Sequence, residues 1–144
     1  MQMGLTVNTD IHDKPRGSFL FNVVPFKEKL AYLTGINNSD VMEEILFDCV
    51  KQCLGFPMWH EQLILVLNGY NTEQQFDVIN VSHELLSMVK LLIHPLLQLV
   101  DMEDGIKIRD FKLSYNLVEI RLINRNYHLN NQPQASEENW DYVS

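Results

Sequence analysis

Three histidines in this sequence stand directly before an acidic residue, an arrangement that serves acid–base chemistry and metal binding. The pairs are His12–Asp13, His60–Glu61 and His83–Glu84. A carboxylate beside an imidazole can orient the ring and hold its proton. Hydrolases also need further groups at fixed spacings, and the sequence contains no HExxH, GxSxG, Walker or GxGxxG motif. A small hydrolase that uses one His–acid pair is therefore the third of three functional hypotheses.

Two cysteines, Cys49 and Cys53, lie four residues apart on one face of a predicted helix. Helix geometry disfavours a disulfide between them, so we expect free thiols in a reducing compartment. The same spacing supplies half of a zinc site, which His60 or His83 would have to complete. No second ligand pair supports such a site, and cysteines on an apolar helix face are usually small core residues. The sequence predicts neither a metal nor another cofactor.

Acidic residues form two clusters that point to binding. The first is Glu43, Glu44 and Asp48, and the second is Asp101, Glu103 and Asp104. The first cluster suits a helix N-terminus, but acids near a helix C-terminus oppose the helix dipole, as the second cluster does. Such unfavourable charge indicates a basic protein partner. The alternative is a solvated surface that only keeps the protein soluble.

Charge is distributed unevenly along the chain of 144 residues, whose net charge is −8. Residues 38–104 hold eleven acids against Lys51 and Lys90, whereas residues 105–128 hold five bases against two acids. The acidic balance argues against nucleic-acid binding. The longest apolar run, 85–102, is interrupted by polar residues and proline, and no signal peptide is apparent, so we expect no membrane span and a cytoplasmic location.

The C-terminal residues 129–144 read as a flexible acidic tail. Trp140 and Tyr142 stand among acids beyond a polar spacer, as in a short docking segment with aromatic anchors. The alternative, equally compatible with the sequence, is that the tail folds back onto its own domain. Residues 1–17 read as an extended lead-in, and residues 18–128 as a single globular domain.

Hydrophobic periodicity predicts an α+β fold with a helical core around one long helix at about 81–102. Its polar residues form one stripe, which predicts a single narrow exposed edge, and Pro95 should kink it. The stripe consists of His83, Ser87, Lys90, His94, Gln98 and Asp101. We expect its apolar residues to be mostly buried, namely Leu86, Val89, Leu92, Ile93, Leu96 and Leu97.

Shorter helices are predicted on the N-terminal side of the long one. One spans 26–34, with Pro25 in its first turn and Gly35 at its end. Another ends at Gly55, and its start has several N-cap candidates over 37–40; with Asp40 as the cap, Glu43 completes a capping box. Residues 57–68 fit a helix or a buried strand, and the regular spacing of glycines favours the helix. Residues 72–79 resemble a short helix with a capping box.

Period-two patterns predict an antiparallel β-hairpin over about 106–124 and a possible N-terminal strand at 18–24. The alternation changes phase near Arg109 and Asp110, which indicates a bulge. The turn should include Tyr115 and Asn116, with Asn as the residue that tolerates positive φ.

Two further functional hypotheses follow from the acidic composition. The first is a non-enzymatic binding protein that occludes a basic protein partner, as an immunity protein, antitoxin or inhibitor does. The second is a structural or assembly protein, in which case it could be viral and work in the host-cell cytoplasm, with subunit contacts on its acidic surface.

The absence of complete ligand spacings generates a testable prediction. Protein purified without chelators should contain no stoichiometric zinc, iron or manganese by elemental analysis. One tightly held metal per chain, lost in Cys49→Ala or Cys53→Ala, would contradict it.

Overall fold

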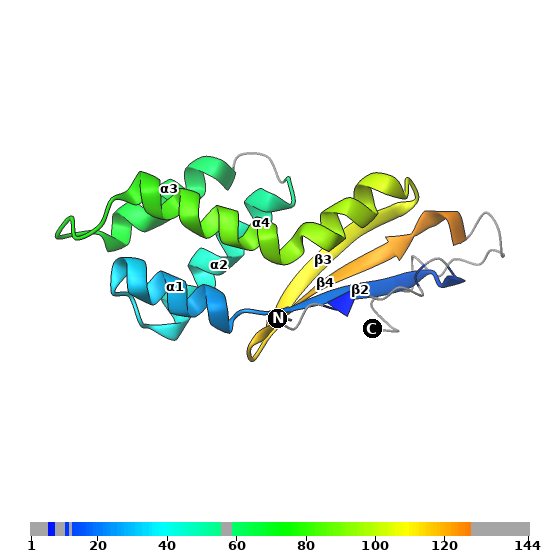
Figure 1. Cartoon of the computed structure of the whole chain (residues 1–144), viewed down its shortest axis with the longest axis horizontal. Helices are drawn as coiled ribbons and strands as arrows, with labels where there is room; N and C mark the ends of the chain where they lie inside the picture. The colour runs from blue at the N-terminus through cyan, green and yellow to red at the C-terminus, as the bar shows by residue number, and fades with distance from the viewer. Residues whose placement is uncertain (1–5, 8–10, 12, 56–58, 128–144) are drawn as a thin grey trace. The chain divides into compact units, whose positions relative to one another are not determined.

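The computed structural model of the chain describes residues 6–7, 11, 13–55 and 59–127. Its contacts group into two compact units: unit 1 comprises 1–22 and 93–144, and unit 2 comprises 23–92. The fold is α+β, as predicted (Figure 1). That residues 18–128 form a single domain stays a prediction. The elements are β1 (Thr6–Val7), β2 (Arg16–Asn22), α1 (Val24–Thr34), α2 (Ser39–Cys53), α3 (Trp59–Tyr70), α4 (Val78–Met102), β3 (Ile106–Ser114) and β4 (Leu117–Asn124).

Unit 1 is built on an antiparallel sheet with the strand order β1-β2-β4-β3. The predicted hairpin is confirmed as β3 and β4, and β2 pairs with β4 from Arg16↔Ile123 to Asn22↔Leu117. The N-terminal strand begins two residues before the predicted 18–24, because Arg16 and Gly17 also pair with β4. It ends at Asn22 because α1 begins at Val24.

The two faces of this sheet differ in polarity, as period-two alternation requires. On one face Phe19 of β2 lies opposite Ile120 of β4, and Phe21 lies opposite Val118. These four side chains are fully buried. The opposite face mixes apolar and charged residues and includes the cross-strand pair Asp110–Arg121. Burial of one face sets the register, because a shift of one residue would exchange the two faces.

The bulge predicted in β3 is confirmed, since the pairing with β4 shifts between Ile108 and Asp110. The turn at Tyr115 and Asn116 is also present, because Ser114 pairs with Leu117. However, Tyr115 takes the positive φ of 57°, which was predicted for Asn116. A two-residue hairpin needs positive φ at its first position, and the register of the strands places Tyr115 there.

A buried asparagine attaches the N-terminal segment to the end of the sheet. Asn124 donates a hydrogen bond from Nδ2 to the Ile11 carbonyl at 2.7 Å, and its backbone N–H donates to the Pro15 carbonyl at 2.8 Å. Its Oδ1 accepts from the Asn126 N–H at 3.1 Å. The Ile11 side chain is fully buried. The described part of the predicted lead-in therefore contributes a strand, β1, and a core side chain to unit 1.

The short helices of unit 2 follow the predicted termination signals. Helix α1 has Pro25 in its first turn and ends at Gly35, whose left-handed backbone lets its N–H donate to the Ala31 carbonyl. Residues 59–70 are helical, which confirms the helix favoured for 57–68 within the described residues. For α2 the cap is Asn38 and not Asp40: the Asn38 side chain accepts from the N–H groups of Asp40 and Val41.

The short helix predicted at 72–79 is wrong, because residues 71–77 form a connecting loop. The Asn71 side chain holds this loop: its Oδ1 accepts from the N–H groups of Gln75 and Phe76, and its Nδ2 donates to the Phe76 carbonyl. The Asp77 carboxylate then accepts from the first N–H groups of the next helix. Helix α4 therefore begins at Val78, earlier than the predicted start near 81.

Helix α4 contributes residues 78–92 to unit 2 and 93–102 to unit 1. All six residues of the predicted polar stripe are exposed. Five of the six predicted core residues are buried, and the sixth, Leu97, is half-buried. The prediction of a single narrow exposed edge is wrong, since Ile79, Leu91 and Met102 are exposed as well.

By length and composition alone α4 is long and apolar enough to cross a membrane, a test that core helices of soluble proteins also pass. The kink at Pro95 stays a prediction.

Neighbouring leucines of α4 allow a matched test of this packing. Leu92 is 1% exposed and Leu91 is 75% exposed. Leu92→Ala should lower the free energy of unfolding by about 2–5 kcal/mol because it leaves a cavity. Leu91→Ala should change it by less than about 0.5 kcal/mol. Urea unfolding of both variants tests this, and similar losses in the two would contradict the orientation of the helix.

Candidate functional site

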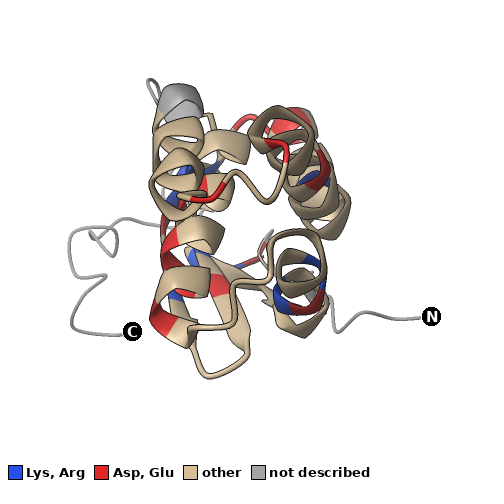
Figure 2. Cartoon of the chain, turned by 90° about the vertical axis from the view of Figure 1, so that its left-hand side faces the viewer, with Lys and Arg blue, Asp and Glu red and all other residues tan. Residues whose placement is uncertain are grey.

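Five acidic residues gather at one end of unit 2, which we call the acidic end. They come from the first turns of α2, from the 71–77 loop and from the cap of α4. They are Asp40, Glu43, Glu44, Glu73 and Asp77. The helices bring them together because α3 packs against α2 and runs back to this end, where the loop leads into α4. Figure 2 views the chain from this side and shows acidic residues on the helices and connecting segments that face the viewer.

A tyrosine links two of the segments that form the acidic end. The Tyr70 hydroxyl, at the last residue of α3, donates a hydrogen bond to Glu44 Oε1 of α2 at 3.2 Å. This hydrogen bond, followed by the negative charge of Glu44, raises the pKa of the Tyr70 phenol. The phenol therefore stays protonated and keeps donating to the carboxylate. The Tyr70 ring remains 43% exposed, so the acidic end also presents apolar surface.

The loop of the acidic end is ordered by its own side chains. Besides the bonds of Asn71, Gln75 Nε2 donates to Glu73 Oε1 at 2.8 Å, which restrains that exposed carboxylate. An open hollow of about 710 Å³ lies beside the loop. It is lined mostly by polar residues: Asn68, Asn71, Gln74, Gln75, Phe76, Asp77 and Val78. This surface can accept hydrogen bonds from cationic or amide side chains of another molecule.

The first predicted cluster is only partly exposed. Glu44 is exposed and Glu43 is half-buried, but Asp48 is buried, with 6% of its surface accessible. Asp48 is therefore largely inaccessible in this structure, and its contact with a partner stays a prediction. Burial raises the pKa of the Asp48 carboxyl, the charge of Lys51 lowers it, and Glu44 raises it further.

The second predicted cluster belongs to unit 1, whereas the acidic end belongs to unit 2. Asp101 lies in the last turn of α4 and is exposed, as is Asp104 in the turn before β3. Glu103, between them, is half-buried. Two of its three carboxylates are thus accessible, and their contact with a partner stays a prediction. Trp140 and Tyr142 lie outside the described residues.

The sequence also suggested three His–acid pairs as catalytic candidates. The structure describes both side chains only for His83–Glu84. The Glu84 carboxylate pairs with Lys29 Nζ at 3.1 Å, so it is already engaged by a cation other than His83. His12 and the side chains of His60 and Glu61 lie outside the described part.

The two thiols are free within unit 2. Cys49 is fully buried, and burial raises the pKa of its thiol. Cys53 is partly exposed; its Sγ contacts the Leu86 carbonyl at 3.8 Å, and burial raises its pKa to about 11. Both thiols are therefore protonated near neutral pH and poor nucleophiles. Among the described residues, no three His, Cys, Asp or Glu side chains lie where they could hold a metal ion.

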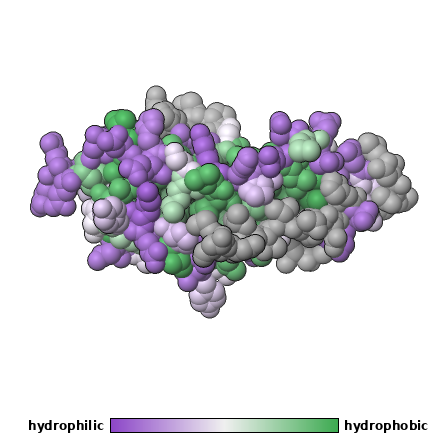
Figure 3. All heavy atoms as spheres, in the orientation of Figure 1, coloured by the Kyte–Doolittle hydropathy of each residue, from purple (hydrophilic) through white to green (hydrophobic). Residues whose placement is uncertain are grey.

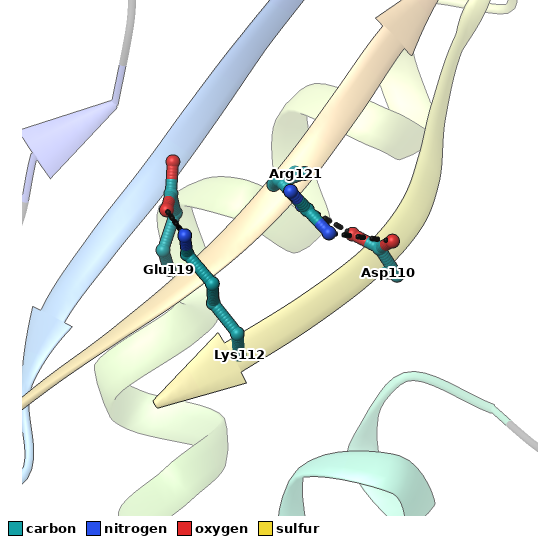
Figure 4. Close-up of polar contacts among 4 residues, drawn as sticks. All are labelled: Asp110, Lys112, Glu119 and Arg121. Atoms are coloured by element: carbon teal, nitrogen blue, oxygen red, sulfur yellow. Dashed lines mark hydrogen bonds and ion pairs between the residues drawn. The ribbon is translucent and has the colours of Figure 1, made fainter. Parts of the chain in front are cut away.

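The basic stretch that follows α4 is partly neutralised within the polar face of the sheet. Arg121 binds both carboxylate oxygens of Asp110, at 2.6 and 2.9 Å, and Lys112 pairs with Glu119 at 3.7 Å (Figure 4). These cross-strand pairs stabilise the hairpin. They account for both acids of residues 105–128.

Sequence reasoning assigned no partner-binding role to Asp40, Glu73, Asp77 or Tyr70. One signal was present, because no Lys or Arg lies between Lys51 and Lys90. Their convergence depends on the α2–α3 packing, which the sequence pattern alone does not reveal. Comparison with protein-family models, with curated proteins and with solved structures found no match for this chain. Functional conclusions therefore depend on the chemistry of its own surface.

Burial of Asp48 predicts a specific pH dependence of stability. Its carboxyl has a higher pKa in the folded than in the unfolded chain, so its contribution to stability falls as pH rises from 3.8 through the folded-state pKa. Asn carries no charge to desolvate. The free energy of unfolding of Asp48→Asn, measured relative to that of the natural protein by urea unfolding, should therefore increase as pH rises from about 3.5 to about 7.

The exposed Asp101 provides the control, since Asp101→Asn should show a smaller change over the same range. The burial of Asp48 would be contradicted if the Asp48→Asn difference were independent of pH or changed in the opposite direction.

Proposed function

We propose that this chain is a non-enzymatic binding protein whose acidic end contacts and occludes a basic protein, in the manner of immunity proteins, antitoxins and inhibitors. One observation carries the proposal: five carboxylates converge from three segments of unit 2, and these segments contain no Lys or Arg. Negative potential concentrated at one end speeds the encounter with a positively charged surface.

Helix dipoles account for part of this acidity but not for all of it. Asp40 in the first turn of α2 and Asp77 at the cap of α4 complement the partial positive charge of the helix N-termini. Glu73 lies in the loop, and Glu44 lies beyond the first turn of α2. Among the described residues neither charge has a comparable partner, although side chains hydrogen-bond both carboxylates. Glu44 and Glu73 are therefore the residues we assign to the partner.

The exposed ring of Tyr70 adds an anchor next to these charges. Tyrosines at protein interfaces contribute large contact areas at low entropic cost, and they often dominate the binding energy. A basic partner would place Arg or Lys against Glu44 and Glu73 and apolar atoms against Tyr70. We propose a reducing setting such as the cytoplasm, which suits the free thiols, with neither nucleic acid nor membrane as the partner.

A second candidate, a structural or assembly protein, is favoured by a different observation. Several large apolar side chains are strongly exposed: Tyr32 at 87%, Leu91 at 75% and Tyr115 at 93%. Exposed apolar groups are common on protein surfaces, but aromatic ones are typical of subunit contacts. This alternative predicts association between copies of the chain.

Charge reversal tests the first proposal. The partner should be captured with the natural protein from its native cells, purified, and assayed by stopped-flow association at several salt concentrations. The association rate should fall as salt rises, because screening shortens the range of the attraction. Glu44→Lys with Glu73→Lys should slow association at low salt by at least about tenfold, as expected for lost steering.

Asp101→Lys with Asp104→Lys is the matched control, since it changes the net charge equally in unit 1. The control should reduce the rate much less. A partner without a basic surface, or equal effects of the two double variants, would contradict the assignment to the acidic end.

A further inference from the structure

The last turn of α3 contains an asparagine followed directly by a glycine, Asn68–Gly69, the only such pair in the chain. In such a pair the backbone nitrogen of the glycine can attack the side-chain carbonyl carbon of the asparagine, because glycine has no Cβ to obstruct the approach. Both residues are exposed. Asn68 also lines the polar hollow beside the 71–77 loop. The order and exposure of the two residues therefore define a candidate modification site.

Within the described part of the chain, no other segment restrains the two reacting groups. The Asn68 side chain makes no hydrogen bond there. Apart from the chain neighbours of Gly69 and the nearby backbone of α3, no atom in that part lies within 4 Å of where a Cβ on Gly69 would stand. Figure 3 shows hydrophilic residues gathered at this end of unit 2, on the left as in Figure 1. Water, the second reactant, therefore has access.

The other place where a side-chain carbonyl precedes a glycine, Asp104–Gly105, is held more firmly. There the Asn126 side chain occupies the space where a Cβ on Gly105 would lie. The Gly105 carbonyl also accepts a hydrogen bond from the Arg125 N–H at 2.9 Å. Because these contacts fix the backbone of Gly105, we expect reaction at Asn68 and not at Asp104.

The helix itself is the remaining barrier to the reaction. While α3 is intact, its hydrogen-bonded backbone keeps the Gly69 nitrogen from turning toward the Asn68 side chain. Opening of the last turn removes this barrier, and helix ends open at low free energy. Glycine favours opening because it loses more conformational freedom in a helix than other residues do. Tyr70 opposes opening through the hydrogen bond from its hydroxyl to Glu44 Oε1 at 3.2 Å.

We propose that Asn68 deamidates spontaneously, at a rate limited by the hydrogen bond between Tyr70 and Glu44. The Gly69 nitrogen forms a bond to the side-chain carbonyl carbon of Asn68, and the displaced amide group leaves with the Gly69 proton as ammonia. The product is a cyclic imide. Water then adds to one of the two imide carbonyls and breaks its bond to nitrogen, which gives aspartate or, through the other carbonyl, isoaspartate. The reaction consumes one water and needs no oxidant, reductant or enzyme.

Either product places a new carboxylate in the acidic end. Asn68 and Asp77 line the same hollow, and the new group is ionised at neutral pH. Each molecule therefore gains negative charge beside Asp77 as it ages. Isoaspartate also lengthens the main chain by one methylene group and so displaces Tyr70 from Glu44. Faster association with a basic protein rests on the proposed function, whereas the deamidation itself does not.

Peptide mapping by mass spectrometry tests the reaction in the natural protein, incubated folded in mildly alkaline buffer. The fragment that contains Asn68 should gain the mass that separates an amide from an acid, and the converted protein should elute later from an anion-exchange column. Asn116 is also exposed but precedes leucine, so it should keep its amide. An Asn68 amide that survives an incubation long enough to convert the free peptide of residues 66–70 would overturn the proposal.

Three variants test the cause. Gly69→Ala places a methyl group in open space and stabilises the turn, so it should slow the loss of the Asn68 amide by at least about fivefold. Tyr70→Phe removes the hydroxyl that bonds Glu44 and should speed the loss by about two- to tenfold. Tyr32→Phe removes another exposed hydroxyl, from α1, and should leave the rate unchanged.

An unchanged rate in Gly69→Ala, or equal rates in Tyr70→Phe and Tyr32→Phe, would contradict the proposed cause. None of these measurements involves a partner. Their outcome is therefore independent of whether the acidic end binds a basic protein.

Discussion

The pairing of β2 with β4 is the interaction on which the rest of the structure depends. It joins segments that lie about a hundred residues apart, and closing so long a loop costs conformational entropy. Burial of Phe19 and Phe21 against Ile120 and Val118 offsets that cost and specifies the register. Because the chain leaves the sheet at Asn22 and re-enters unit 1 at Ile93, all of unit 2 is an insertion between paired strands.

The insertion determines where charge accumulates. Unit 2 holds more than twice as many acids as bases, whereas the hairpin that follows it is basic. Within unit 2 the acids are concentrated by side-chain–backbone hydrogen bonds. Asn38 fixes the start of α2, Asn71 folds the loop, and Asp77 fixes the start of α4. These three local motifs fix the segments that carry the carboxylates, and the packing of α3 against α2 brings those segments to one end of the unit.

The sequence was most informative where a local pattern decides the structure. Alternation predicted the hairpin and its bulge, and Gly35 marked the end of α1. It failed where packing or side-chain hydrogen bonds decide: Asp48 follows the polar pattern of α2 yet is buried, and Leu91 follows the apolar pattern of α4 yet is exposed. Of the two acidic clusters predicted from sequence, only Glu43 and Glu44 belong to the acidic end. The other acids of the acidic end were not predicted, because the α2–α3 packing is what brings them close to Glu43 and Glu44.

The role of the acidic end is tested most directly by mapping the bound partner through amide chemical shifts in the full chain. Addition of the basic partner should perturb the first turns of α2, the end of α3 and the 71–77 loop. Perturbations confined to the β3–β4 hairpin or to residues 101–104, with the acidic end unchanged, would contradict it.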